Sequence, residues 1–228
     1  DIDPYFNKVV LSLHMNGANN GTSFADNSNS HHFFTASGDA KQTVAPKFGS
    51  GSLTLDGTTD YLIGDGSSNF AFGSNDFTIE FWTYFVTVVN NSKLYDSRPT
   101  NTNGAYALIT VSNTGDNTIR YGTTGASPWI TGTTAVSAGQ WYHIAVSRTG
   151  TNTKLFINGV QDGSTYTDTN VYLNDPSGRP YIGAASGAAV PGTLGHNGLI
   201  DDVRITNGVG RYTANFTVPA RQFPDKGR

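Results

Sequence analysis

Hydrophobic and polar positions alternate most clearly in residues 140–160, which predict two strands joined by a polar turn. In the first strand Ile144 and Val146 share one face, because successive side chains of a strand point to opposite sides. The second strand alternates in the same way around Leu155 and ends at the Asn-Gly pair of residues 158–159. That pair suits a tight turn, since Asn tolerates a positive φ and Gly adopts one freely. The stretch therefore predicts an antiparallel hairpin whose single apolar face packs against a second layer.

The longest predicted strand is residues 77–89, which is apolar on both of its faces. Phe77, Ile79 and Phe81 share one face, and Trp82 lies on the other. A strand that is apolar on both sides lies centrally in a sheet or lines a groove. Together with shorter strands and a turn every 8 to 12 residues or so, this pattern favours one domain built as a two-sheet sandwich or a barrel. The shorter strands are expected at residues 9–15, 31–36, 53–55, 61–63, 93–96, 106–111, 118–121, 129–131, 180–184 and 199–206.

The composition supports an all-β chain and excludes several classes of function. Charged residues make up 14% of the chain, while 13 Phe, 11 Tyr and 3 Trp supply the apolar surface of a core. A net charge of −3 gives no basic footprint, so no nucleic-acid partner is expected. No apolar run approaches the roughly 20 residues that span a bilayer, so no membrane insertion is expected. The chain has no cysteine, which excludes disulfides and thiolate metal sites.

The two ends of the chain are interpreted as attachments to one domain. Residues 1–8 are predicted to be an N-terminal tether, residues 9–219 the folded domain, and residues 220–228 a C-terminal tail. The first residue is Asp rather than Met, and no signal-peptide pattern follows it. We therefore expect a processed product or a segment of a longer protein.

Four segments of the chain, taken together, carry a resemblance to a known family. They are residues 47–49 (Lys-Phe-Gly) with 55–62 (Leu-Asp-Gly-Thr-Thr-Asp-Tyr-Leu), 76–82 (Asp-Phe-Thr-Ile-Glu-Phe-Trp), the 140–160 hairpin, and 198–208 (Gly-Leu-Ile-Asp-Asp-Val-Arg-Ile-Thr-Asn-Gly). In this order and spacing they resemble the LamG-like domain of the concanavalin A-like lectin/glucanase superfamily. The resemblance implies two antiparallel sheets in a jelly-roll sandwich. It also implies a function in glycan binding or adhesion, although some hydrolases and lyases use the same scaffold.

The carboxylates of the chain do not form the pair that glycoside cleavage needs, which is two groups roughly 5 to 10 Å apart. Glucanases of this fold resemble one another in a Glu-x-Asp-x-x-Glu strand, whereas this chain has a single glutamate, Glu80, without an acidic partner at those offsets. Asp201 and Asp202 are neighbours on a predicted strand, so their side chains point to opposite faces. The five His residues show no zinc spacing, and no Gly-x-Ser-x-Gly elbow is present. We therefore expect no enzyme activity and interpret Glu80 as a hydrogen-bonded sheet residue.

A structural Ca²⁺ is implied by the resemblance, because many domains of this kind hold the ion with Asp side chains and loop carbonyls. The loop 24–30 (Phe-Ala-Asp-Asn-Ser-Asn-Ser) is similar to the family's Asp-x-Ser-Gly-Asn loop, although its Gly is missing here. This similarity implies Asp26 as one ligand. Asp202 falls where the second acidic ligand of the family is expected. The alternative is that these Asp residues simply cap turns.

A carbohydrate site is expected among the aromatic residues of the loops. Lectin sites stack aromatic rings on the apolar face of a sugar and surround it with a few polar groups. The alternative for each ring is that it covers the edge of the core. The candidates are Tyr95, Tyr121, Trp129 and Tyr166, with Tyr172 as a further loop aromatic.

The sequence as a whole predicts a non-catalytic binding domain that recognises surface glycans. Residues 211–219 (Arg-Tyr-Thr-Ala-Asn-Phe-Thr-Val-Pro) resemble the end of a variant common in tailed-phage structural proteins. This implies a place on the exposed surface of a virion or on another extracellular adhesive protein. The partners are then glycans or other virion proteins, and a homo-oligomer is left open. The alternatives are a structural module that decorates or cements a virion and, second, a polysaccharide-degrading enzyme.

Overall fold

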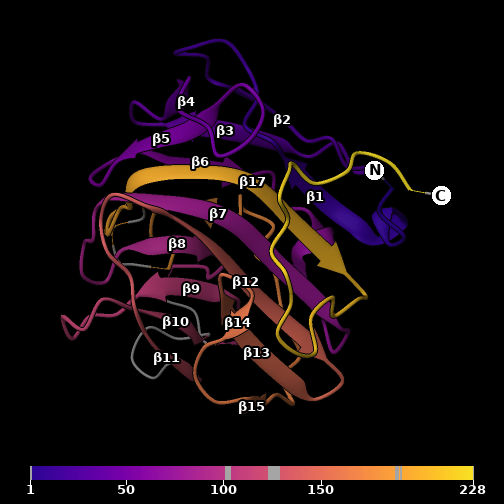
Figure 1. The fold of residues 1–228 in the computed structure, drawn as a ribbon. Coiled ribbons are helices and arrows are strands. Elements are labelled where there is room, and N and C mark those ends of the chain that lie inside the picture. The colour runs from indigo at the N-terminus through magenta and orange to yellow at the C-terminus, as the bar shows by residue number, and fades with distance from the viewer. Residues whose placement is uncertain (1, 101–103, 123–128, 188–189, 191, 228) are drawn as a thin grey trace.

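The structure, a computed structural model, describes residues 2–100, 104–122, 129–187, 190 and 192–227. Almost all of its regular secondary structure is β-strand, and the strands form two antiparallel sheets packed into a sandwich (Figure 1). This architecture confirms the predicted all-β, two-sheet jelly-roll fold. Asp1, the residue on which the expectation of processing rests, lies outside the described residues.

One of the two sheets, called sheet A here, contains the hairpin and the long strand predicted from the sequence. The strand β1 (Val9–Leu13) pairs with β17, and β15 (Tyr166–Thr167) pairs with β13, beside the main path of the sheet. The main path runs β14 (Val160–Gln161), β13 (Asn152–Ile157), β12 (Trp141–Thr149), β7 (Phe77–Thr87), β17 (Asn197–Asn207), β5 (Ser52–Asp56) and β4 (Lys41–Thr43).

The opposing sheet, called sheet B here, is made of shorter strands. Two 3₁₀ helices, η1 (Phe6–Lys8) and η2 (Ser68–Phe70), lie outside the sheets. In the part of the chain that the structure describes, no helix has the length and apolarity to cross a membrane. The strand order of sheet B is β11 (Ile130–Ala135), β10 (Thr118–Gly122), β9 (Leu108–Val111), β8 (Lys93–Asp96), β16 (Tyr181–Ile182), β6 (Tyr61–Gly64), β3 (Phe33–Ser37) and β2 (Ser23–Ala25).

The predicted hairpin is present as β12 and β13, with Ile144 opposite Ile157 and Val146 opposite Leu155. All four of these side chains are buried, which confirms the apolar face. The Asn-Gly pair that follows β13 adopts positive φ at both residues, 50° and 80°, as its turn requires. The long strand β7 lies between β12 and β17, so the strand that is apolar on both faces is indeed central.

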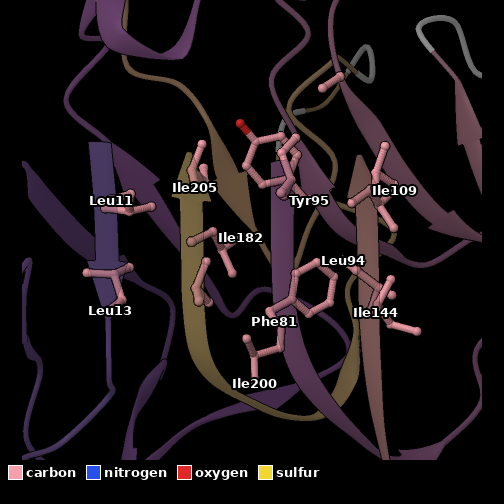
Figure 2. Close-up of a cluster of buried hydrophobic side chains, with 14 of the residues drawn as sticks. Leu11, Leu13, Phe81, Leu94, Tyr95, Ile109, Ile144, Ile182, Ile200 and Ile205 are labelled. Atoms are coloured by element: carbon pink, nitrogen blue, oxygen red, sulfur yellow. The ribbon is translucent and has the colours of Figure 1, made fainter. Parts of the chain in front are cut away.

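The core lies between the two sheets and is formed by alternate residues of the facing strands. Phe81 and Ile144 from sheet A point toward Leu94 and Ile109 from sheet B (Figure 2). These side chains are at most 2% exposed. Burial of this apolar surface is the main force that holds the two layers together.

The ends of the chain are packed against the domain, which corrects the predicted N-terminal tether and C-terminal tail. Asp3 and Phe6 are buried, and the backbone N–H of Asp3 donates to the carbonyl of Lys226 at 3.0 Å. Phe223 is also buried, and the guanidinium carbon of Arg204 lies 3.8 Å from the centre of its ring. The sequence prediction missed this packing because the partners of each end are distant in sequence.

The boundaries of several strands also differ from the sequence prediction. The segment expected to begin at residue 31 becomes β3 only at Phe33, because His31 takes a positive φ of 50° that a strand does not allow. Four strands were not predicted, namely β2, β4, β14 and β15, each of which has only two or three residues. Stretches this short carry too few alternating positions to be detected.

Candidate functional site

A groove of about 650 Å³ lies where β2 and β3 of sheet B meet β4 of sheet A. These strands lie close together at the edge of the sandwich (Figure 1). The chain joins the two sheets here through Gln42, whose backbone N–H donates to the carbonyl of Gly21 at 2.8 Å. Its side-chain amide donates to the carbonyl of Ser23 at 2.9 Å. The groove is lined by Asn20, Thr22, Ser23, Phe24, Phe33, Phe34, Thr35, Ala36, Gly38, Asp39, Ala40 and Lys41.

The aromatic ring of Phe33 is the most exposed large apolar side chain of the described residues, at 80%. Its neighbour Phe34 is buried in the core, because adjacent residues of β3 point to opposite faces. A flat ligand that covers an exposed phenyl ring gains the free energy of burying its apolar surface. Phe33 therefore presents a flat apolar surface beside the groove.

The backbone at Phe33 is fixed by hydrogen bonds to a single carboxylate. Asp65 Oδ2 accepts from the backbone N–H of Phe33 at 3.3 Å and contacts Nδ1 of the buried His32 at 2.8 Å. Burial tends to raise the pKa of Asp65, but the hydrogen bonds from His32 and from the N–H of Ser67 hold that pKa below its usual value. The ring of His32 also packs on Phe70, with centroids 4.8 Å apart. The position of Phe33 is therefore set before any ligand arrives, which lowers the entropic cost of binding.

Polar groups along the groove complete the composition of a small-molecule site. Asn20, Thr22 and Thr35 are exposed and make no side-chain hydrogen bond to the described residues. Asp39 is exposed, and its Oδ2 pairs with the ammonium of Lys41 at 3.1 Å. Hydroxyl, amide and carboxylate groups next to a flat ring are the groups that recognise a sugar.

Two of the predicted carbohydrate-binding residues are buried in strands rather than placed in loops, which corrects that part of the prediction. Tyr95 lies in β8 and Tyr121 in β10, and their rings are 1% and 0% exposed. Tyr121 donates its hydroxyl to Tyr172, which donates in turn to the buried carboxylate of Asp168. A ring enclosed in this way presents no face to an external sugar. The strands that hold both residues were predicted, at residues 93–96 and 118–121, but the sequence pattern did not show that both rings face the core.

Trp129 and Tyr166, the other two predicted residues, lie side by side and are half-buried. Their rings stack in parallel at 4.8 Å with an angle of 6° between the planes. Trp129 also contacts Tyr121 edge-on at 5.9 Å, so this pair covers the end of the core. Each ring thus has one of its faces covered by the other ring. The groove at Phe33 lies elsewhere in the fold.

Phe33 was missed by sequence reasoning, although a signal for it was present. Two consecutive phenylalanines in a strand must point to opposite faces, so one of Phe33 and Phe34 has to leave the core. The same alternation identified the hairpin, but it was not applied to this shorter strand.

The carboxylate of Asp26 is fully used by protein donors, which does not fit the predicted calcium site. Its Oδ1 accepts from the N–H groups of Ser12 and Ser28, both at 2.9 Å. Its Oδ2 accepts from the Ser28 hydroxyl and the His32 N–H, both at 2.8 Å. A carboxylate oxygen has two lone pairs in its plane, so none remains for a cation. Asp26 therefore acts as a turn and strand anchor, the alternative stated for it.

Asp202 is also occupied, by partners on two other segments. Its Oδ1 lies 2.6 Å from Nδ1 of His14, and its Oδ2 accepts from the N–H of Phe223 at 2.9 Å. The other ring nitrogen of His14 contacts the carboxylate of Asp225. Burial raises the pKa of Asp202, whereas these two carboxylates raise the pKa of His14 against the effect of its own burial. Among the described residues no group of three or more His, Cys, Asp or Glu side chains is arranged to hold a metal ion.

Glu80, the single glutamate, is a buried structural residue, as the sequence analysis interpreted it. Its Oε1 accepts from Arg204 Nε at 2.9 Å, and its Oε2 accepts from the hydroxyl of Tyr212 at 2.7 Å. Arg204 and Arg211 both bind the buried carboxylate of Asp3 as well. Burial tends to raise the pKa of Glu80, but Arg204 and then His143 hold it well below its usual value. The carboxylate is therefore ionised and neutralised inside the protein.

Residues 209–223, called the C-terminal segment here, cover Glu80 on the outer face of sheet A. Tyr212 and Phe216 of this segment stack at 3.6 Å, and Phe216 contacts the rings of Phe156 at 5.4 Å and His143 at 5.8 Å. Since Glu80 has no exposed surface, no substrate reaches it in this arrangement.

The regular alternation expected at Asp201 and Asp202 is interrupted, because Asp202 has a positive φ of 49° and the pairing of β17 with β7 shifts register between Asp201 and Arg204. The two carboxylates nevertheless bind different segments of the chain. Asp201 Oδ2 accepts from the N–H groups of Lys47 and Phe48 at 2.7 and 3.0 Å. Its Oδ1 has no hydrogen-bond partner among the described residues. Burial, together with the charge of Asp202, raises the pKa of Asp201 to about 7.

This raised pKa predicts the pH dependence of a conservative variant. Folded Asp201 keeps its proton up to about pH 7, whereas the unfolded chain loses it near pH 4. Stability from this group is therefore complete below about pH 4 and is lost as the pH rises to about 7. Asp201→Asn is uncharged at every pH and does not lose this stability. The free energy of unfolding of the variant minus that of the wild type should therefore increase by about 1–3 kcal/mol between pH 4 and pH 8. Urea denaturation at both pH values measures this change, and a constant difference would show that Asp201 is not protonated.

A protein-family model matches most of the chain. The model of the concanavalin A-like lectin/glucanases superfamily, Laminin_G_3, matches residues 56–210. The groove, which lies within residues 20–41, precedes this stretch. No curated protein sequence matches the chain.

Three solved structures are similar to this chain in fold. Domain 4 of AbnA, an extracellular arabinanase from Geobacillus stearothermophilus, in complex with arabinotriose, is 20% identical with a TM-score of 0.61, covering 88% of this chain and 93% of that one. The binding domain of Paraclostridial Mosquitocidal Protein 1 is 16% identical with a TM-score of 0.66, covering 90% of this chain and 50% of that one. A sialidase from Trypanosoma rangeli in complex with sialic acid is 14% identical with a TM-score of 0.63, covering 89% of this chain and 31% of that one. The chain thus spans about half of that binding domain and a third of the sialidase, and at these identities the likeness concerns the fold alone.

Proposed function

Because the chain belongs to the concanavalin A-like lectin/glucanases superfamily, we propose that it is a non-catalytic domain that binds carbohydrate in the groove beside Phe33. The observation that carries this proposal is the ring of Phe33, which is exposed to 80% while its backbone is held in place by Asp65. Such a ring supplies the stacking surface for a sugar, and the groove supplies polar groups for its hydroxyls. The AbnA domain in complex with arabinotriose supports the choice of an oligosaccharide as the ligand class.

The proposal that the domain does not cleave its ligand is supported by the position of Glu80. The only glutamate of the chain is enclosed by two arginines and covered by the C-terminal segment. A glycosidase needs a carboxyl group that reaches the scissile bond and a second one across from it. Incubation of the purified protein with the polysaccharides it binds tests this point, and any depolymerisation would contradict it.

For the biological setting we propose the exposed surface of a phage virion or of another extracellular adhesive protein. The resemblance of residues 211–219 to the end of a domain variant of tailed-phage structural proteins supports this setting. The competing role is a module that decorates or cements a virion through protein contacts. Absence of glycan binding together with tight binding to capsids or tails would favour that competing role.

Truncation of the stacking ring tests the proposed site. We expect Phe33→Ala to weaken binding of the best oligosaccharide from a glycan array at least tenfold, which corresponds to about 1.4 kcal/mol for the loss of the stacked ring. Thermal unfolding should be unchanged, because truncating an exposed side chain alters stability by about 0.5 kcal/mol or less. Isothermal titration calorimetry measures the affinity.

Matched variants separate a loss of stacking from a general effect. Phe33→Trp restores a flat ring and should keep the affinity within about threefold of the wild type. Val171→Ala truncates another exposed apolar side chain, 60% exposed and outside the groove, and should bind as the wild type does. Unaltered affinity of Phe33→Ala would place the sugar elsewhere.

A further inference from the structure

The charges at the groove are unevenly distributed, with more carboxylates than ammonium groups. Asp39 lines the groove, and its backbone N–H donates to Oδ1 of Asp60 at 2.5 Å. Asp65 accepts from the N–H of Phe33 at the other end of β3. The ammonium group at the groove belongs to Lys41, which is paired with Asp39. Asp60 and Asp65 do not line the groove but lie directly beside its lining residues, so three carboxylates and the single ammonium of Lys41 lie at or next to it among the described residues.

The titration of Asp60 is consistent with a negative local field. Burial raises the pKa of this carboxyl, and the negative charges of Asp56 and Asp39 raise it further. Charges within about 10 Å of one another interact appreciably at physiological ionic strength, since that distance is close to the Debye length. A ligand in the groove lies within this range of Asp39, which lines it.

The carboxylate of Asp39 has one oxygen available to a ligand. Its Oδ2 is held by Lys41, whereas its Oδ1 has no partner among the residues that the structure describes. The side chain is 87% exposed. A carboxylate oxygen only accepts hydrogen bonds, so it favours the hydroxyl groups of a sugar and repels an acidic substituent.

We propose that the groove selects neutral oligosaccharides over sugars that carry a carboxylate or sulfate, with Asp39 as the residue that determines this specificity. The inference rests on the proposed function and names the substrate class of the same site. Asp39 accepts from sugar hydroxyls through Oδ1, Lys41 holds its other oxygen in place, and the surplus of carboxylates disfavours an anion.

The test compares neutral oligosaccharides with their acidic counterparts. Lactose-based and cellulose-based oligosaccharides are paired on an array with forms that carry sialic acid, uronic acid or sulfate. The best neutral ligand and its acidic counterpart are then titrated by calorimetry at about 20 and 150 mM NaCl. We expect the acidic form to bind at least tenfold more weakly at low salt, and this ratio to shrink at high salt because the repulsion is screened.

Two variants that each remove one negative charge show whether the preference for neutral ligands arises at Asp39. Asp39→Asn removes one negative charge from the groove and should reduce the preference for the neutral ligand by about threefold or more. Asp116→Asn removes one negative charge from the turn between β9 and β10, at the opposite end of sheet B, and should leave the preference unchanged. Equal effects of the two variants would overturn the role of Asp39.

The outcomes distinguish the inference from the function on which it rests. If acidic ligands bind as tightly as neutral ones and Phe33→Ala still weakens them, the inference is overturned and the carbohydrate site stands. If neither series binds, the proposed function fails and the inference fails with it.

Discussion

Replacing Glu80 with alanine is expected to destabilise the protein by about 3–5 kcal/mol, the largest effect that we predict for one substitution. Arg204 and Arg211 would lose a carboxylate in a site without solvent, and the hydroxyl of Tyr212 would lose its acceptor. A buried charge left without its partner is costly because the protein interior solvates it poorly. Urea denaturation monitored by tryptophan fluorescence measures the free energy of unfolding.

Two further variants show whether the effect comes from the buried charge. Glu80→Gln keeps an acceptor for Tyr212 and should cost less, about 1–3 kcal/mol. Lys41→Ala breaks the exposed pair with Asp39 and should cost at most about 0.5 kcal/mol. A loss below 1 kcal/mol or so for Glu80→Ala would contradict the structural role of the network.

The depressed pKa of Glu80 fixes the sign of its pH dependence. The group stays ionised in the folded protein to well below the pH at which the unfolded chain takes up its proton, near pH 4. Its contribution to stability is therefore present above that pH and is lost as the solution becomes more acidic. The difference between wild type and Glu80→Ala should shrink accordingly below about pH 4.

Replacing Asp26 with alanine is expected to cost about 3–4 kcal/mol. The substitution removes the acceptor of three backbone N–H groups, which belong to Ser12, Ser28 and His32. Because Asp26 connects β1 to the residues that precede β3, its loss should also loosen the base of the groove at Phe33. Denaturation measures the stability, and calorimetry with the array ligand should show weaker binding.

The same variant tests the calcium prediction. Since the oxygens of Asp26 are occupied by protein donors, the cost of Asp26→Ala should be equal in excess Ca²⁺ and in chelator. A cost that rises in Ca²⁺ would show that the folded protein binds the ion through Asp26, because a ligand of the folded state adds stability only where its site is intact. Asp26→Asn keeps one acceptor oxygen and should give an intermediate loss in both solutions.

Most strands were predictable from the sequence, including short ones such as β8 and β16, whereas four strands of two or three residues were not. The β12–β13 hairpin was found from its alternation and its Asn-Gly turn, and β7 from its length and its two apolar faces. The strands β2 and β4, which form the groove, have three residues each. Their position depends on partners far along the chain, such as the bonds of Gln42 to Gly21 and Ser23, which no local pattern encodes.

The site residues were harder to predict than the fold because burial is a tertiary property. Tyr95 and Tyr121 have the composition of sugar-binding residues, yet the packing of sheet B encloses them. Asp26 resembles a metal ligand, yet its loop turns back so that the backbone N–H groups of Ser28 and His32 bind the two carboxylate oxygens. Phe33 is the contrary case, since the rule that adjacent strand residues diverge identifies it once the strand is known.

The central claim is that carbohydrate binds in the groove between β2, β3 and β4. Amide chemical-shift mapping of the isotope-labelled protein during titration with the best array oligosaccharide tests it most directly. We predict that the saturable shifts cluster in residues 20–24 and 33–41, around the ring of Phe33. Saturable shifts that cluster instead around Trp129 and Tyr166, or over the C-terminal segment, would contradict the account.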